Sequence, residues 1–276
     1  QRRLSSLNRF KRFYFNLILW VKKALFTVNN NNTMFGKLNN LSVWMLIGAI
    51  CFTSCGDDDS DDATLGIDCG ETSNPLFEEE NSFVLVEFED AEFESEWSLI
   101  NNLSNSTGRG YMLWEGENFF GNPGNGLATY RIKINTPGTY RFIWRSAVKE
   151  GDNGTEANDT WLRFADADDF YGEKSNGSIV YPKGTGKTPN PEGASSDGWF
   201  KVYRSGNDLD FKWQARTSDN DAHPIFVQFD DAGTYTMEIS GRSKGHAIDK
   251  FLLFKPDVYT ENEATELTDF SGITCE

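Results

Sequence analysis

Three acidic side chains from opposite ends of the sequence could hold a metal ion together. Glu87 and Glu89 end an apolar strand pattern at 83–89, and Asp249 lies in a late apolar run at 248–254. The first and last strands of a jelly roll often lie side by side. A hard cation takes several oxygen ligands. The sequence therefore predicts that these three carboxylates converge on one hard cation.

The elements that would position these residues have strand periodicity. Residues 233–254 alternate apolar and polar side chains, turn at 241–245 and resume an apolar run, and residues 126–148 have the same build around a Pro137-Gly138 turn. We predict an antiparallel hairpin at each place. Further strand patterns occur at 83–89, 110–114, 159–164, 199–203, 211–215 and 224–229. Because no long amphipathic helix is present, the fold class is predicted to be all-β, a single jelly-roll β-sandwich.

The beginning of the chain has a different composition. The first 55 residues contain eight of the 26 basic residues and no Asp or Glu. A short basic segment from Met34 and an apolar run at 41–52, too short to span a bilayer, predict a signal peptide at 34–54. Residues 1–33 are interpreted as translated sequence ahead of the true start, without a fold. An uncleaved membrane anchor is the alternative.

The end of this segment resembles a bacterial lipoprotein signal. In such signals the cysteine, here Cys55, is acylated and becomes the mature N-terminus, and the acidic run at 56–62 resembles the surface-export signal of Bacteroidetes lipoproteins. The resemblance implies an outer-membrane protein, lipid-anchored and facing the cell surface. The expected parts are 1–33 (extension), 34–54 (signal), 55–82 (lipidated cysteine and acidic tether), 83–256 (β-sandwich) and 257–276 (acidic tail).

Charge and cysteines limit the partners and the compartment. Past Cys55, 18 basic residues stand against 42 acidic ones, a net charge of −24 that repels nucleic-acid phosphates and anionic headgroups. Cys51 would leave with the signal and Cys55 would take the lipid. In an oxidising compartment the remaining Cys69 and Cys275 are expected to form a disulfide joining the two ends of the exported domain.

Two motifs that look catalytic fail on their context. Residues 241–245 match G-x-S-x-G, but a nucleophile elbow needs a following helix, whereas a strand pattern follows here. Residues 184–188 are similar to a phosphate loop, but Pro189 and Pro191 prevent the helix that would bind phosphate. Neither motif supports an active site.

Five motifs follow one another in a fixed order along residues 83–255. These are E-x-E-D-A from Glu87, Y-R-I-x-I-x-x-P-G-T-Y from Tyr130, D-G-W-F-K-V-Y from Asp197, A-G-T-Y-T-x-x-I-x-G-R from Ala232 and I-D-K-F-x-L from Ile248. In this order they resemble the β-sandwich carbohydrate-binding modules of the family 6 and family 35 type, whose fold is galactose-binding-domain-like.

The resemblance implies a structural calcium at Glu87, Glu89 and Asp249, and a sugar site on aromatic faces at the loop end, where Trp199 matches the Trp of D-G-W. Two departures change that site. Residues 126–128 lack the family's second platform aromatic, and residues 246–248 lack the Asn that precedes the last Asp. The expected site is therefore rebuilt from other side chains, namely Trp114, Phe119, Trp161, Trp213, Asn158, Asp159, Arg145 and His246.

The function implied by the resemblance is non-catalytic binding of a polysaccharide or oligosaccharide, which the protein would hold for glycan-degrading enzymes or a transporter. One alternative is a jelly-roll glycan lyase or glycoside hydrolase, for which Tyr171, Tyr181 and His223 are the only indications. Another is a structural or adhesive surface protein in which the Trp side chains are all buried.

Overall fold

The computed structural model describes residue 69 and residues 74–101, 105–191 and 194–276. The chain divides into two units, Gln1–Asp61 and Asp62–Glu276, and all described residues belong to the second. Cys55, the signal peptide and the 1–33 extension lie outside the described residues. Among the described residues, no helix has the length and apolar character to cross a membrane. The prediction of an all-β fold is confirmed, since α2 (Glu261–Thr265) is the one α-helix in this part of the chain.

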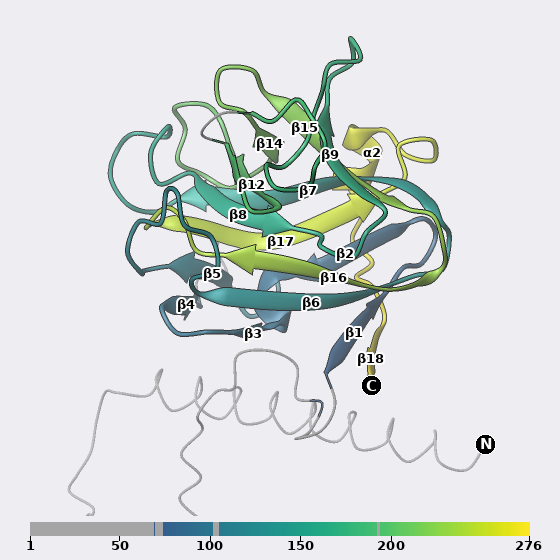
Figure 1. The fold of residues 1–276 in the computed structure, drawn as a ribbon. Coiled ribbons are helices and arrows are strands. Elements are labelled where there is room, and N and C mark those ends of the chain that lie inside the picture. Colours follow the sequence, from purple (N-terminus) through teal and green to yellow (C-terminus); the bar gives the residue numbers. More distant parts are fainter. Residues whose placement is uncertain (1–68, 70–73, 102–104, 192–193) are drawn as a thin grey trace, which may run out of the picture. The chain divides into compact units, whose positions relative to one another are not determined.

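One sheet is centred on β6 (Leu127–Ile134) and β16 (Gly233–Ser240), which lie side by side in Figure 1. In β6 the side chains of Ala128, Tyr130 and Ile132 are buried, and those between them are more exposed, as expected for a strand with one face on the core. The sheet runs in the order β18 (Ile273–Cys275), β1 (Pro75–Glu78), β6, β16, β8 (Asp159–Arg163), β12 (Trp199–Tyr203) and β14 (Arg216–Thr217), with β3 (Glu92–Phe93) beside β6 and β11 (Ser195–Ser196) beside β12.

The second sheet is centred on β7 (Gly138–Val148) and β17 (His246–Phe254). Beyond β7 lie β15 (His223–Phe229), β9 (Asp169–Glu173) and β10 (Ile179–Val180). The other edge of β17 pairs with β2 (Phe83–Glu87) and β5 (Tyr111–Trp114). Shorter additions are β4 (Trp97–Ile100) on β5, β13 (Lys212–Trp213) on β7, and the 3₁₀ turn η1 (Phe88–Asp90) after β2.

The two predicted hairpins are wrong. β6 pairs with β16, β1 and β3, whereas β7 pairs with β17, β15 and β13. In the same way β16 belongs to the first sheet and β17 to the second. Each turn therefore crosses from one sheet to the other, because both strands bury apolar side chains against the same core from opposite sides. The alternating pattern identifies the buried face of a strand but not its partner.

Aromatic rings fill the space between the sheets. Tyr130 of β6 meets Phe251 of β17 edge to face, with ring centroids 5.0 Å apart, and Phe142 of β7 lies 6.1 Å from the same Phe251 ring. All three side chains are fully buried. Offset and edge-to-face ring pairs of this kind add to the stabilisation from buried apolar area. The core therefore holds the sheets in register and fixes where their loops emerge.

The ends of the described chain belong to the sandwich. β1 runs parallel to β6, and β18 pairs antiparallel with β1, as Figure 1 shows near the C-terminus. The predicted disulfide is confirmed: Cys69 and Cys275 are bonded, with Cα atoms 5.4 Å apart. The sandwich thus extends past residues 83–256 on both sides, into segments expected to be a tether and a tail.

Candidate functional site

The three carboxylates predicted to bind a cation lie around one short segment, Thr107–Arg109. β2 and β17 are neighbours, with Glu87 opposite Lys250, and the register of β17 shifts at Asp249. The Thr107 amide donates to Asp249 Oδ1 at 2.9 Å, and its hydroxyl donates to Glu87 Oε2 at 2.9 Å. The Arg109 amide donates to Glu89 Oε1 at 2.6 Å. One loop segment therefore binds all three side chains.

Burial makes this carboxylate cluster (Glu87, Glu89, Asp249) electrostatically costly. Glu87 is 7% exposed, and Glu89 and Asp249 are fully buried. Burial raises the pKa of Glu87 to about 7, with the Glu89 charge adding to it and the Thr107 hydroxyl opposing it. Burial likewise raises the pKa of Glu89 to about 7. Asp249 has a cationic partner in Arg145, at 2.8 Å. The Lys250 charge lowers the pKa of Glu87 and the Arg109 charge lowers that of Glu89, but burial has the larger effect on both groups.

Only part of the cluster is suited to a hard cation. Glu89 Oε2 is buried and has no hydrogen-bond partner among the described residues, and an orphaned buried oxygen is costly unless something binds it. The Thr107–Arg109 segment, however, lies among the three carboxylates. In the described part of the chain no group of three or more His, Cys, Asp or Glu side chains is placed to hold one ion. Calcium at this cluster stays a prediction.

A separate cavity lies at the loop end of the sandwich, with a volume of about 380 Å³. Three loops line it: β5–β6 with Asn118 and Phe120, β7–β8 with Glu150, Glu156 and Asn158, and β16–β17 with Ser243 and Lys244. Asp159, the first residue of β8, also lines it. We call it the loop-end cavity. It holds Asn158 and Asp159, two of the residues predicted to bind a sugar.

Arg242 organises the loop-end cavity. Its guanidinium lies 5.1 Å from the Phe120 ring centroid and 5.0 Å from the Trp161 ring centroid. The same group pairs with Asp159 Oδ1 at 2.5 Å. Phe120 is 57% exposed although it is a large apolar side chain. An exposed ring held in place by a cation beside fixed polar groups is suited to stacking against a ligand.

Three of the Trp residues predicted to form the sugar platform are buried, and so is His246, which was predicted to line the rebuilt site. Trp114 is 0% exposed, Trp161 1%, Trp199 3% and His246 0%. A Cβ atom at Gly126, whose φ is +56°, would lie 2.2 Å from the Trp114 ring, so the loop backbone covers that ring closely. Trp161 donates its indole N–H to the Phe119 carbonyl at 2.9 Å. Trp114 and Trp161 therefore support the floor beneath the loops.

The other predicted site residues lie elsewhere. The Arg163 guanidinium lies over the Trp199 ring, 4.4 Å from the ring centroid. Trp213 of β13 pairs in register with Arg145 of β7, whose side chain binds Asp249. Phe119 is half-buried against Trp114. The predicted set is therefore divided between the loop-end cavity, the carboxylate cluster and the Trp199 region.

Sequence reasoning did not assign Phe120, Asn118 or Arg242 to the site. The available signal was the pair of Phe residues in a Gly-, Asn- and Pro-rich loop at 115–125, outside any alternating pattern. That signal identifies an exposed ring but not its neighbours. Arg242 reaches Phe120 across 122 positions of sequence, a contact that no local pattern indicates.

The residues named for an enzymatic alternative do not meet in one groove. Tyr171 lies on the half-exposed side of β9, with its ring centroid 6.3 Å from that of Tyr181. His223 lies on the buried face of β15 with 0% exposure, and its Nε2 is hydrogen-bonded to Ser178 Oγ at 3.0 Å. Within the described residues these three side chains do not converge.

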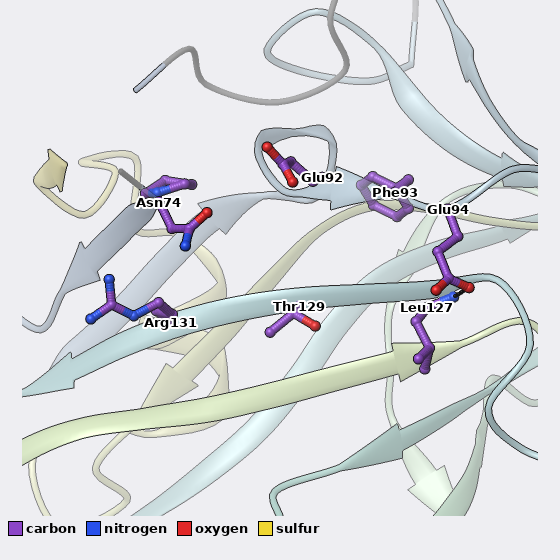
Figure 2. Close-up of a pocket in the computed structure, with 8 residues that line it drawn as sticks. Asn74, Glu92, Phe93, Glu94, Leu127, Thr129 and Arg131 are labelled. Atoms are coloured by element: carbon purple, nitrogen blue, oxygen red, sulfur yellow. Dashed lines mark hydrogen bonds between the residues drawn. The ribbon is translucent and has the colours of Figure 1, made fainter. Parts of the chain in front are cut away.

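A further cavity, of about 360 Å³, lies along the outer edge of β6. β1 and β3 both pair with this edge and leave a gap between them, which Figure 2 shows with Arg131 and Thr129 on β6 and Glu92 opposite. Glu94 closes one end by accepting a hydrogen bond from the Leu127 amide at 3.0 Å. No aromatic ring in it is as exposed as Phe120, so it is the weaker candidate for sugar binding.

No protein-family model and no curated protein sequence matches the chain. A GH26-CBM35 β-(1,4)-mannanase of Podospora anserina is 20% identical with a TM-score of 0.38, over 63% of this chain and 28% of that one. This chain thus spans little more than a quarter of that enzyme.

Two similar structures are isolated modules. A family 35 carbohydrate-binding module from Clostridium thermocellum is 15% identical with a TM-score of 0.37, over 63% of this chain and 98% of that one. The module CBM6cm-2 of Cellvibrio mixtus lichenase 5A, in complex with cellotriose, is 13% identical with a TM-score of 0.34, over 62% of this chain and 96% of that one.

Proposed function

We propose that this protein binds a polysaccharide at the loop-end cavity and does not cleave it. The observation that carries the proposal is the exposed Phe120 ring, held by Arg242 at the rim of a cavity that also contains Asn118, Asn158 and Asp159. The apolar faces of sugars stack on aromatic rings, while amides and carboxylates bind their hydroxyl groups. Tyr171, Tyr181 and His223, the residues named for the lyase or hydrolase alternative, do not line this cavity.

A lipid anchor and a calcium ion would attach the domain to a membrane and stabilise its fold. We infer that Cys55 is lipidated, that the domain is displayed outside the cell from an outer membrane, and that Glu87, Glu89 and Asp249 hold a structural calcium. The sequence pattern supports the lipid, and the orphaned Glu89 oxygen supports the ion. Calcium there would neutralise buried carboxylates and tie β2 to β17, while the loop-end cavity would bind sugar independently.

Phe120→Ala is expected to weaken binding of the recognised glycan by about tenfold, because loss of a stacking contact between a sugar and one aromatic ring costs on the order of 1–2 kcal/mol. The measurement is a glycan array followed by titration calorimetry, with product release assayed in parallel. Phe270→Ala is the matched control, since Phe270 is also exposed, at 42%, but lies in the C-terminal segment.

Three results would count against the proposal. Equal losses from both Phe substitutions would remove Phe120 from the site. Release of shortened glycan would favour the lyase or hydrolase alternative. Absence of binding to every glycan, with a folded protein, would favour the structural or adhesive alternative.

A further inference from the structure

The outer face of the second sheet is covered over only part of its width. The C-terminal segment contacts the β2 and β17 side, where the Phe270 ring centroid lies 5.3 Å from Lys250 Nζ of β17 and the Tyr259 ring packs edge to face on Phe83 of β2. Glu261 of α2 reaches Arg141 of β7. Beyond β7, strands β15 and β9 present the half-exposed Phe226 and Tyr171. This side of the face is open.

A hollow of about 630 Å³ lies on that open side. We call it the basic hollow; Arg141, Lys174, Arg216, Glu173, Asn176 and Phe226 are among its lining residues. Its lining has three cations and one carboxylate, in a chain whose net charge is −16. The loop-end cavity has the opposite balance, with three carboxylates (Glu150, Glu156, Asp159) and one cation, Lys244.

The cations of the basic hollow are unequally neutralised. Arg141 pairs with Glu261 at 2.6 Å, and Lys174 pairs with Asp221. No ion pair or side-chain hydrogen bond of Arg216 occurs among the described residues. Arg216 is nevertheless close enough to Arg141 that its charge, after burial, helps to lower the pKa of the Arg141 guanidinium. Two neighbouring guanidinium groups with one carboxylate partner between them favour a further anion.

Aromatic rings lie next to these cations. Phe226 is in register with Arg141 on one side and with Tyr171 on the other. The Arg141 guanidinium is 5.9 Å from the Phe226 ring centroid, and the Tyr171 and Phe226 rings stack at 5.8 Å with an interplanar angle of 20°. Apolar ring surface beside unmatched cationic donors suits a sugar that carries an acidic group.

We propose that the basic hollow binds an anionic sugar residue, with its carboxylate or sulfate on Arg216 and Arg141 and its ring against Phe226. The inference rests on the proposed polysaccharide binding and names the chemical class of a second contact. The loop-end cavity, with its negative lining, takes an uncharged part of the glycan. The chain thereby recognises an acidic polysaccharide although its surface as a whole is acidic.

The test is titration of the full chain with three polymers: polygalacturonate for a carboxylate, dextran sulfate for a sulfate and dextran as the uncharged reference. We expect at least one charged polymer to bind about tenfold or more tightly than dextran. Arg216→Gln should remove about tenfold of that affinity, because a charge-assisted guanidinium contact is lost. Which charged polymer responds to Arg216→Gln identifies the acidic group.

Arg131→Gln is the matched control, since it removes an arginine of the first sheet that lies outside the basic hollow. If both arginine substitutions lowered the affinity for the charged polymer equally, the effect would come from overall charge, and the proposal would be overturned. Failure of both charged polymers to bind more tightly than dextran would also overturn it. Neither result affects the loop-end cavity, because Phe120→Ala tests that site separately.

Discussion

Chelation of calcium is expected to lower the melting temperature of the folded domain by several degrees. Without the ion, Glu87, Glu89 and Asp249 confront one another around Thr107–Arg109 with one buried oxygen unpartnered. Ligand binding to the folded state alone adds about 2.7 kcal/mol when the ligand is at a hundredfold its dissociation constant, and 1 kcal/mol shifts Tm by about 2–4 °C in a domain of this size. Calorimetry with chelator and with added calcium measures the shift.

Asp249→Ala is expected to abolish this calcium response and to destabilise the domain by about 3 kcal/mol, because Arg145 and the Thr107 amide lose their acceptor. Asp249→Asn is the control for folding, since it keeps an oxygen acceptor and removes the charge. The effect of calcium on the melting temperature should be absent in Asp249→Ala and weak in Asp249→Asn. A melting curve of the unaltered protein that responds neither to chelator nor to added calcium would remove the metal from this site.

His246 is expected to make the domain sensitive to acid. Burial, with a smaller contribution from the Arg204 charge, lowers the pKa of His246 to about 3. An unfolded chain has a histidine pKa of about 6.5, so between pH 6.5 and 3 only the unfolded state takes up this proton. Stability therefore falls as the pH drops through that window. At pH 4 this residue alone lowers the free energy of unfolding by on the order of 3 kcal/mol.

The comparison that isolates His246 is His246→Asn, which removes the titrating ring while the many carboxylates stay. The difference in unfolding free energy between pH 7 and pH 4 should be smaller in the variant by about that amount. Imidazole proton resonances assigned with the same variant should show His246 neutral down to pH 4. A His246 signal that titrates near pH 6, or identical pH dependence in both proteins, would contradict the prediction.

The carboxylate cluster was the part of the molecule most accessible to sequence reasoning. The apolar run ending at Glu87 and the one containing Asp249 predict neighbouring strands, and β2 and β17 are paired with Lys250 opposite Glu87. The Cys69–Cys275 bond followed from the expected fates of the other two cysteines. In both cases the inference needed only residue type and order along the chain.

The rest depended on contacts that periodicity does not contain. Trp114 and Trp161 are the residue type expected in a sugar platform. Their large apolar side chains are nevertheless buried beneath the loops, where burial stabilises the fold. The alternating pattern of β16 and β17 predicted which face of each strand is buried. It did not predict that the two strands belong to different sheets. The exposed ring of Phe120 is set by Arg242, which the sequence places far away. Long-range packing therefore decided which aromatic residue faces solvent.

The bond between Cys69 and Cys275 also defines how a mechanical load would pass through the domain. A pull applied at Cys69 acts through the sulfur bridge on β18 as well as along the backbone toward β1. β1 resists by shearing against its parallel neighbour β6, where several hydrogen bonds must break together. A domain that holds a polymer at its loop end and is anchored upstream of Cys69 would therefore share the strain between both chain ends instead of peeling from one.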